Sequence, residues 1–129
     1  MDKEGLFQVA FNQICQKKLR RFGMAGHVVC ALETKKGNIF TGICIDLPCS
    51  IGLCAEQSAI AEMIKHGETV IKQIVTVFED GSILPPCGRC REFIAQIDDN
   101  NIQTKIILPE FREMYIQDLL PERWDKKWV

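Results

Sequence analysis

Three cysteines and a glutamate occupy spacings that suit metal-assisted hydrolysis. Cys54 stands two residues before Glu56, and Cys87 and Cys90 form a Cys-x-x-Cys pair. Both segments are expected at the starts of helices, where backbone N–H groups and the positive end of the helix dipole stabilise thiolates. Three thiolates on zinc would leave a fourth position open for water, whereas closed structural sites use four protein ligands. The pattern is therefore typical of a catalytic zinc site.

Glu56 is close enough to Cys54 to reach a water at such a site without being a ligand itself. A carboxylate in this position can accept a proton from water and pass it to a substrate nitrogen. Taken alone, Glu56 is equally explained as a first-turn carboxylate that the helix dipole favours. The neighbouring cysteines are what favour the catalytic interpretation.

Two other interpretations of the cysteines remain open at this point. Cys87 and Cys90 could cycle between dithiol and disulfide at a helix start, but that would leave Cys54 and Glu56 without roles. A closed structural zinc site would use Cys44 or Cys49 as its fourth ligand. Such a site would make the chain a binding or scaffold module and would have no use for the glutamate.

The elements that must position these residues alternate between helices and strands. Phe7, Phe11 and Phe22 belong to a set of apolar residues that recur every three or four positions, which predicts a first helix ending before Gly23. This order predicts an α/β fold, a three-layer α/β/α sandwich around a mixed five-stranded sheet. The other expected elements are a hairpin of His27–Thr34 and Ile39–Asp46, a helix at Cys54–Lys65, a strand at Val70–Phe78, a helix after Pro85-Pro86, and strands at Lys105–Leu108 and Met114–Ile116.

His27 begins the first of these strands, and His66 ends a helix. Neither histidine has ligand spacing to another residue. We therefore expect both to have structural or solvent-facing roles.

Length and composition narrow the class of protein. Residues 1–129 are treated as a single folding unit, because domain sizes cluster at about 100–150 residues. No run approaches the roughly 18 apolar residues of a membrane span, and a net charge of −1 offers no global field for a phosphate backbone. An odd count of seven cysteines, with no secretory signal at the N-terminus, predicts a reducing, cytoplasmic setting.

The combined motifs resemble the cytidine deaminase family, in its small form with three cysteine ligands. Pro-Cys-Gly-Arg-Cys-Arg also looks like blasticidin S deaminase, which acts on a cytosine-bearing nucleoside antibiotic. The resemblance implies that Cys54, Cys87 and Cys90 bind Zn²⁺ and that Glu56 shuttles protons while the 4-amino group of a cytosine nucleoside becomes a carbonyl and ammonia leaves. The segments that carry it are Ile39-Phe40-Thr41-Gly42, Cys54-Ala55-Glu56-Gln57-Ser58-Ala59-Ile60, Pro86-Cys87-Gly88-Arg89-Cys90-Arg91 and Leu119-Leu120-Pro121.

The resemblance also implies substrate contacts and a source of compensating charge. Members of the family commonly hold the ribose with Asn-x-Glu, and Cys44-Ile45-Asp46 is the matching stretch here. Cys44, Asp46 and Ala55 are accordingly the expected substrate-binding residues. An Arg often follows the Cys-Ala-Glu triplet and offsets the thiolate charge, but Gln57 stands there. The helix N-termini and Arg89 or Arg91 are the candidate sources of positive charge, and Arg91 is the expected substitute.

The expected partners are a small nucleoside and further copies of the chain. A homotetramer is implied by the resemblance, in which a Phe after Leu-Leu-Pro packs near a neighbouring subunit's site; Trp124 stands at that position. Trp124 and Trp128 could each be core, interface or pocket lid. A basic strip studded with aromatic residues is missing, which argues against DNA or RNA as substrate. The alternative to an enzyme is a catalytically silent zinc-binding module whose altered Cys44–Asp46 stretch no longer holds a nucleoside.

Overall fold

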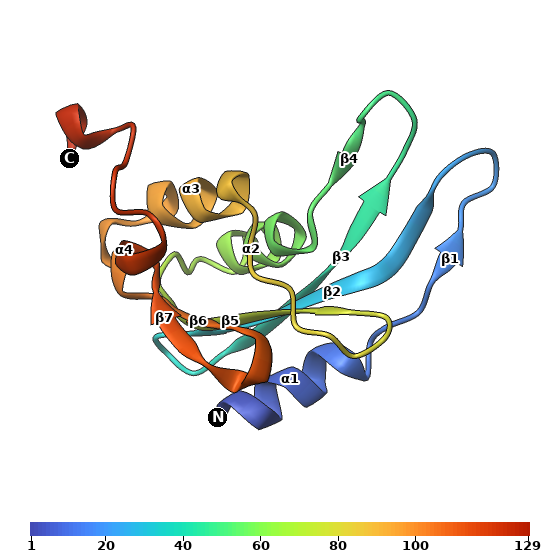
Figure 1. The fold of residues 1–129 in the computed structure, drawn as a ribbon, viewed down its shortest axis with the longest axis horizontal. Helices are drawn as coiled ribbons and strands as arrows, with labels where there is room; N and C mark the ends of the chain where they lie inside the picture. The colour runs from blue at the N-terminus through green and yellow to red at the C-terminus, as the bar shows by residue number, and fades with distance from the viewer.

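A computed structural model of residues 1–129 shows one mixed sheet with helices on both faces (Figure 1). The strand order is β4-β3-β2-β5-β6-β7, and β1 pairs with β2. Only β5 and β6 run parallel to each other. The elements in chain order are α1 (Lys3–Phe11), β1 (Lys17–Lys18), β2 (Met24–Thr34), β3 (Ile39–Asp46), β4 (Gly52–Leu53), α2 (Ala55–Lys65), β5 (Ile71–Phe78), α3 (Gly88–Ile97), β6 (Lys105–Ile107), β7 (Glu113–Tyr115) and α4 (Ile116–Leu119).

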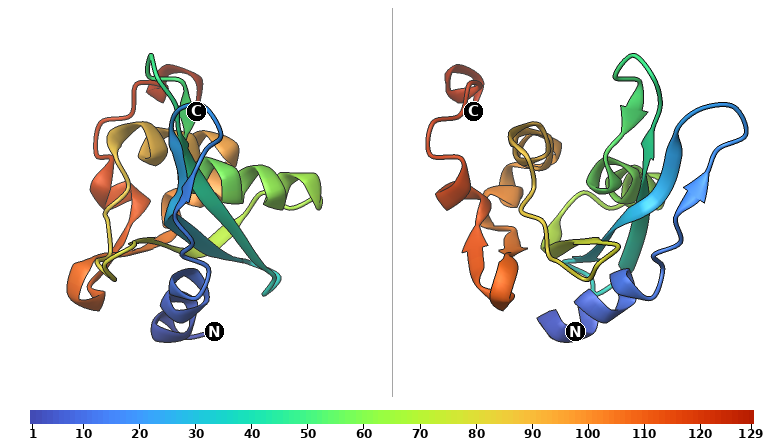
Figure 2. Two further views of the ribbon diagram at one scale, coloured as in Figure 1. Left: turned by 90° about the vertical axis from the view of Figure 1, so that its right-hand side faces the viewer. Right: turned by 45° about the vertical axis from the view of Figure 1, so that its right-hand side comes forward.

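The sheet separates two hydrophobic cores. Along β2, Val29 and Ala31 face α1, whereas Cys30 and Leu32 face α2 and α3. This alternation follows from the two-residue period of a strand, and all four side chains are fully buried. Helix α1 therefore covers one face and α2 and α3 cover the other, as Figures 1 and 2 show. The expected three-layer α/β/α sandwich is confirmed. None of the helices has the length and apolar character needed to span a bilayer.

The expected five strands correspond to β2, β3, β5, β6 and β7, and two short strands extend the sheet to seven. The added strands, β1 and β4, have two residues each. Strand β7 ends at Tyr115, one residue earlier than expected, because Ile116 begins α4. The hairpin of β2 and β3 and the starts of α2 and α3 agree with the sequence-based expectation, except that β2 begins at Met24, three residues before His27.

The expectation of a first helix reaching Phe22 is wrong in its second half. Helix α1 ends at Phe11, and Lys17 pairs instead with Ala25 at the start of β2. Strand β5 pairs with β2 only from Val28 onward, so the first residues of β2 would otherwise have an unpaired edge on that side. Strand β1 occupies this edge, which helical periodicity alone does not reveal.

Helix α2 lies very close to β3 at Gly42. A Cβ atom added to Gly42 would lie 2.7 Å from the Ala55 carbonyl oxygen and closer still to the Ala59 nitrogen. Only a residue without a side chain permits this approach. Gly42 therefore sets the distance between the sheet and the first turns of α2, where Cys54 and Glu56 begin the helix.

We expect Gly42→Ala to lower the free energy of unfolding by about 2 kcal/mol, because the added methyl group forces α2 away from the sheet. Gly88→Ala is the matched control, since a Cβ there meets nothing within 4 Å. Urea denaturation followed by circular dichroism measures both. Equal stability of the two variants would contradict the close approach.

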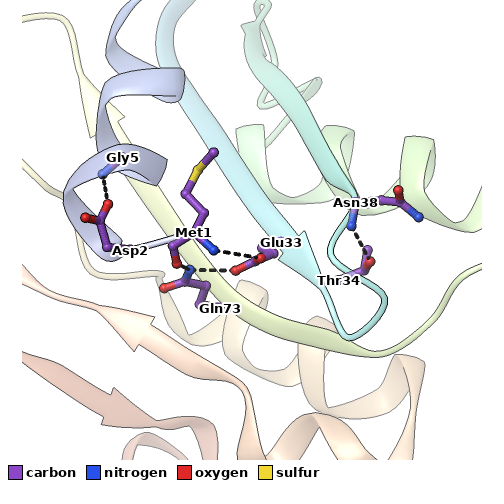
Figure 3. Close-up of polar contacts among 7 residues, drawn as sticks. All are labelled: Met1, Asp2, Gly5, Glu33, Thr34, Asn38 and Gln73. Carbon is purple, nitrogen blue, oxygen red and sulfur yellow. Dashed lines mark hydrogen bonds and ion pairs between the residues drawn. The ribbon is translucent and has the colours of Figure 1, made fainter.

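A buried polar contact joins α1 to the sheet (Figure 3). Glu33 on β2 is 5% exposed and accepts a hydrogen bond of 2.8 Å from the Gln73 side chain on β5. The Met1 amine lies 3.1 Å from the same carboxylate, and Gln73 also donates to the Met1 carbonyl. Burial raises the pKa of Glu33, but the hydrogen bonds from Gln73 and the amine outweigh it and lower the pKa below its ordinary value.

A carboxyl whose pKa is lowered by folding stabilises the protein above its ordinary pKa of 4.5 and loses that contribution as the pH falls. Glu33→Gln removes the contribution. The difference in unfolding free energy between the wild type and Glu33→Gln is therefore expected to shrink as the pH falls below about 4.5. Denaturation curves across that range test this, with the exposed loop variant Glu79→Gln as control. A difference that does not change with pH would refute it.

Candidate active site

Three cysteine sulfur atoms meet where α2 and α3 begin. Cys54 is the N-cap of α2, Cys87 is the N-cap of α3, and Cys90 lies in the first turn of α3. Neither capping side chain is engaged in a hydrogen bond to its own helix. The Sγ atoms of Cys54, Cys87 and Cys90 all lie within 4.8 Å of one another. Thiolates on a tetrahedral zinc stand about 3.8 Å apart, so small movements let this cluster hold the ion.

The cluster of Cys54, Cys87 and Cys90 contains no fourth Cys, His, Asp or Glu. Cys44 belongs to a separate cluster, and Cys49 is exposed in the loop after β3. The closed structural site considered from the sequence thus lacks its fourth ligand. An ion held by these three sulfur atoms would keep one coordination position free.

The three-cysteine cluster lies on the wall of a cavity of about 380 Å³, a size within the range of small-molecule sites. Glu56 and all three cysteines of the cluster line it. The residues expected to bind substrate, Cys44, Asp46 and Ala55, line it as well, whereas Arg91 does not.

Glu56 lies in the first turn of α2 and is 6% exposed. Burial raises the pKa of Glu56, and hydrogen bonding to Thr76 and Cys90 acts in the opposite direction without cancelling it. A carboxyl with raised proton affinity on a cavity wall is suited to carry protons. Thr76 on β5 also lines the cavity. Sequence reasoning missed it, because a threonine within a β-branched strand carries no motif.

The thiolate forms of the cluster cysteines need positive charge nearby to stabilise them. Burial strongly raises the pKa of Cys90, and the nearby charge of Glu56 acts in the same direction. Burial likewise raises the pKa of Cys54, while the positive charge of Arg89 lowers it. A divalent ion bound by the sulfur atoms would stabilise all three thiolates at once.

Arg91 takes a different place from the one expected, and Arg89, the other candidate, lies at the cavity. Arg91 Nε donates to the Pro86 carbonyl at 2.8 Å, and its Nη1 donates to the Leu119 carbonyl at 3.2 Å. Arg89 instead lines the cavity, and its charge acts on Cys54. The structure thus places Arg91 as a bridge between the loop before α3 and the last residue of α4, and Arg89 beside the thiols.

The structure also contradicts the expectation that His27 has no ligand spacing to another residue. His27, Cys44 and Asp46 form a second group of ligand atoms within 4.8 Å of one another, which we call the His27 cluster. His27 Nε2–H donates to Asp46 Oδ2 at 2.8 Å, and Cys44 Sγ lies 3.4 Å from His27 Nδ1. His66 is exposed, contacts the carbonyl and the carboxylate of Glu62 on its own helix, and packs against the Phe40 ring, in line with its expected role.

A β-bulge accounts for the position of His27. Ala25 on β2 pairs with Ile45, but the next pair is Val29 with Ile43. Three residues of β2 therefore lie opposite the single residue Cys44. Such an insertion redirects side chains, so linear spacing could not predict that His27 faces β3.

Trp124 and Trp128 are 64% and 66% exposed, and their ring centroids lie 5.4 Å apart. Neither ring lines the cavity. A core role is excluded for both.

Comparison with known proteins agrees with this geometry. Residues 5–106 match the family model described as the cytidine and deoxycytidylate deaminase zinc-binding region. The chain belongs to this family. Among curated cytidine deaminases, that of Halalkalibacterium halodurans is 30% identical over 95 residues, covering 70% of this chain and 71% of the relative.

The cytidine deaminase of Shewanella halifaxensis is 36% identical over 86 residues, which cover 64% of this chain. The match spans only 27% of that relative, and the match to the cytidine deaminase of Shewanella pealeana spans 31% of its length. The match therefore covers less than a third of the length of each of those two longer proteins.

Solved structures of cytidine deaminases share the fold. The crystal structure of the enzyme from Mycobacterium tuberculosis aligns with a TM-score of 0.81 at 25% identity, covering 96% of this chain and 98% of that chain. The structure from Burkholderia pseudomallei has a TM-score of 0.77 at 22% identity, with coverages of 96% and 100%. The layered architecture of the family is thus preserved.

We expect Arg91→Ala to lower the free energy of unfolding by about 2 kcal/mol, because the partly buried contacts to the Pro86 and Leu119 carbonyls lose a charged donor. Arg89→Ala should change it by less than about 0.5 kcal/mol, since its side chain is exposed. Thermal and urea denaturation of the two variants provide the measurement. The reverse ranking would show that the two arginines are wrongly assigned.

Proposed function

We propose that this chain is a zinc-dependent hydrolytic deaminase that converts the 4-amino group of a cytosine nucleoside, cytidine or deoxycytidine, into a carbonyl and releases ammonia. The observation that carries the proposal is the buried Glu56 beside the cluster of Cys54, Cys87 and Cys90, on the wall of one cavity. Membership of the family and the printed names of the relatives support it.

Cys54, Cys87 and Cys90 would hold the zinc ion from the starts of two helices. The ion, when bound, supplies a Lewis acid that lowers the pKa of water near neutrality. The helix N-termini and the charge of Arg89 would offset the negative charge of the thiolates. We therefore assign to Arg89 the compensating role that the sequence suggested for Arg91.

Glu56 would move the protons of the reaction. Its carboxylate takes a proton from the attacking water and delivers it to N3 of the cytosine ring, which makes C4 a better electrophile. The water oxygen bonds to C4. Glu56 then carries a second proton from that oxygen to the 4-amino nitrogen, the C4–N bond breaks, and ammonia leaves. Its raised pKa suits a group that must both accept and return protons.

Cys44, Asp46 and Ala55 would orient the nucleoside. All three line the cavity, and the carboxylate of Asp46 can accept a hydrogen bond from a sugar hydroxyl. No aromatic side chain of this chain lines the cavity, so the base would find a stacking surface only on another subunit.

A homotetramer would supply such a surface. Trp124 is exposed and stands where the family places an aromatic residue near a neighbouring subunit's site. The free state of all the cysteines supports a reducing, cytoplasmic setting. A small nucleoside, rather than DNA or RNA, fits a cavity of this size.

A second candidate substrate is a cytosine-bearing antibiotic of the blasticidin S type. The Pro86–Arg91 sequence favours it, and so does Cys44-Ile45-Asp46, which departs from the ribose-binding pattern. Ammonia release from cytidine, deoxycytidine, cytosine, blasticidin S, adenosine and guanine decides between them. Turnover of blasticidin S alone would identify the antibiotic, and not cytidine or deoxycytidine, as the substrate. Silence across the panel with zinc bound would favour a catalytically silent zinc-binding module.

We expect Glu56→Gln to lower the rate of ammonia release by about 10²–10⁴-fold while zinc binding is retained, because the proton carrier is lost but the three sulfur ligands remain. Steady-state kinetics and metal analysis on the same samples check both parts. Glu62→Gln, on the outer part of the same helix, is the matched control and should leave the rate unchanged. Loss of zinc from Glu56→Gln would instead make Glu56 a ligand.

A further inference from the structure

We propose that the His27 cluster is a second metal site that takes a divalent transition-metal ion such as Zn²⁺ or Co²⁺. Thiolate, imidazole and carboxylate are all common ligands of zinc. With Cys44 and Asp46 ionised and His27 neutral, the donors carry two negative charges, which match the two positive charges of the ion. The site would thus be electrically neutral, unlike the cluster of three thiolates.

The separations between donor atoms fit such an ion. Zinc bonds of about 2.0–2.1 Å to nitrogen and about 2.3 Å to sulfur, at a tetrahedral angle, place the two donors about 3.5 Å apart. Cys44 Sγ lies 3.5 Å from His27 Nε2 and 3.4 Å from His27 Nδ1, so the imidazole ring must turn for one nitrogen to direct its lone pair at an ion shared with the sulfur. The Nε2 to Asp46 Oδ2 distance of 2.8 Å must widen by about half an ångström to reach tetrahedral spacing.

Asp46 can make this adjustment. It is the last residue of β3, and its side chain is 65% exposed. The other two donors are more buried, since Cys44 is 5% exposed and the His27 side chain is 14% exposed. Two buried donors and one exposed carboxylate give the cluster a path of entry for an ion on the side of Asp46.

The backbone around the cluster is specialised for this arrangement. Cys44 and Asp46 alternate along β3 and so share one face of the strand. The bulge in β2 brings His27 onto the same two side chains. Gly26, directly before it, has a φ of +79°, and an added Cβ would clash with the Cys15 carbonyl oxygen. Bulges commonly redirect a side chain at functional sites.

An ion in this site would affect the proposed reaction. Cys44 and Asp46 line the same cavity as the three-cysteine cluster, on the wall assigned to the nucleoside. Zinc beyond the first equivalent should therefore compete with the nucleoside, raising KM at unchanged kcat. This consequence rests on the proposed function, whereas metal binding itself does not.

Equilibrium dialysis of the full-length chain against Zn²⁺ under reducing conditions, followed by metal analysis, tests the site. The wild type is expected to bind two equivalents, and His27→Ala and Asp46→Asn one each. Cys49→Ser changes an exposed cysteine outside both clusters and should retain two. Asp46→Asn alters an exposed side chain, so its result does not depend on a disturbed core. One equivalent in the wild type that is retained in His27→Ala, or two equivalents in His27→Ala, would overturn the proposal.

Cobalt gives an independent signature. The second equivalent of Co²⁺ should add sulfur-to-metal charge-transfer absorption from one thiolate, and Cys44→Ala should remove this increment. An unchanged increment in Cys44→Ala would also overturn the proposal. Cys87→Ala separates the two sites. If the proposed zinc centre is wrong, Cys87→Ala binds as many equivalents of metal as the wild type. If the second site is wrong, His27→Ala binds as many equivalents as the wild type.

Discussion

The convergence of three cysteine sulfur atoms at the starts of α2 and α3 is the constraint on which the site depends. Burial raises the pKa of Cys54 and Cys90, so the thiolate forms need positive charge close by. Two helix N-termini and Arg89 supply part of it, and a divalent ion would supply the rest. Without a metal ion, the thiolate forms of these cysteines are therefore unfavourable, and a bound ion would stabilise them.

The sheet makes this convergence possible. Gly42 allows α2 to lie against β3, and the hydrophobic core between the sheet and α2 and α3 holds both helix starts at the cavity. Arg91 fixes the loop before α3 through the Pro86 carbonyl. Glu56, in the first turn of α2 and two residues after Cys54, is 6% exposed on the wall of the same cavity. One packing arrangement thus sets both the metal ligands and the environment of the proton carrier.

The sequence was informative where chemistry depends on local order. Cys54, Glu56 and Cys87 could be assigned to helix starts because capping positions and short motifs are properties of a few adjacent residues. It was uninformative where long-range pairing decides. The bulge that turns His27 toward Cys44 depends on the register between two strands, which no local pattern encodes. The end of α1 at Phe11 was missed for the same kind of reason, since β1 forms only because β2 offers it an edge.

The central claim is that the three-cysteine cluster is an open, catalytic zinc centre. X-ray absorption at the zinc edge, on protein loaded with one equivalent, tests it most directly. We predict three sulfur neighbours at about 2.3 Å and one oxygen or nitrogen neighbour at about 2.0 Å. Four sulfur neighbours would indicate a closed structural site, and a shell without sulfur would show that Cys54, Cys87 and Cys90 are not the ligands. Either result would contradict the account.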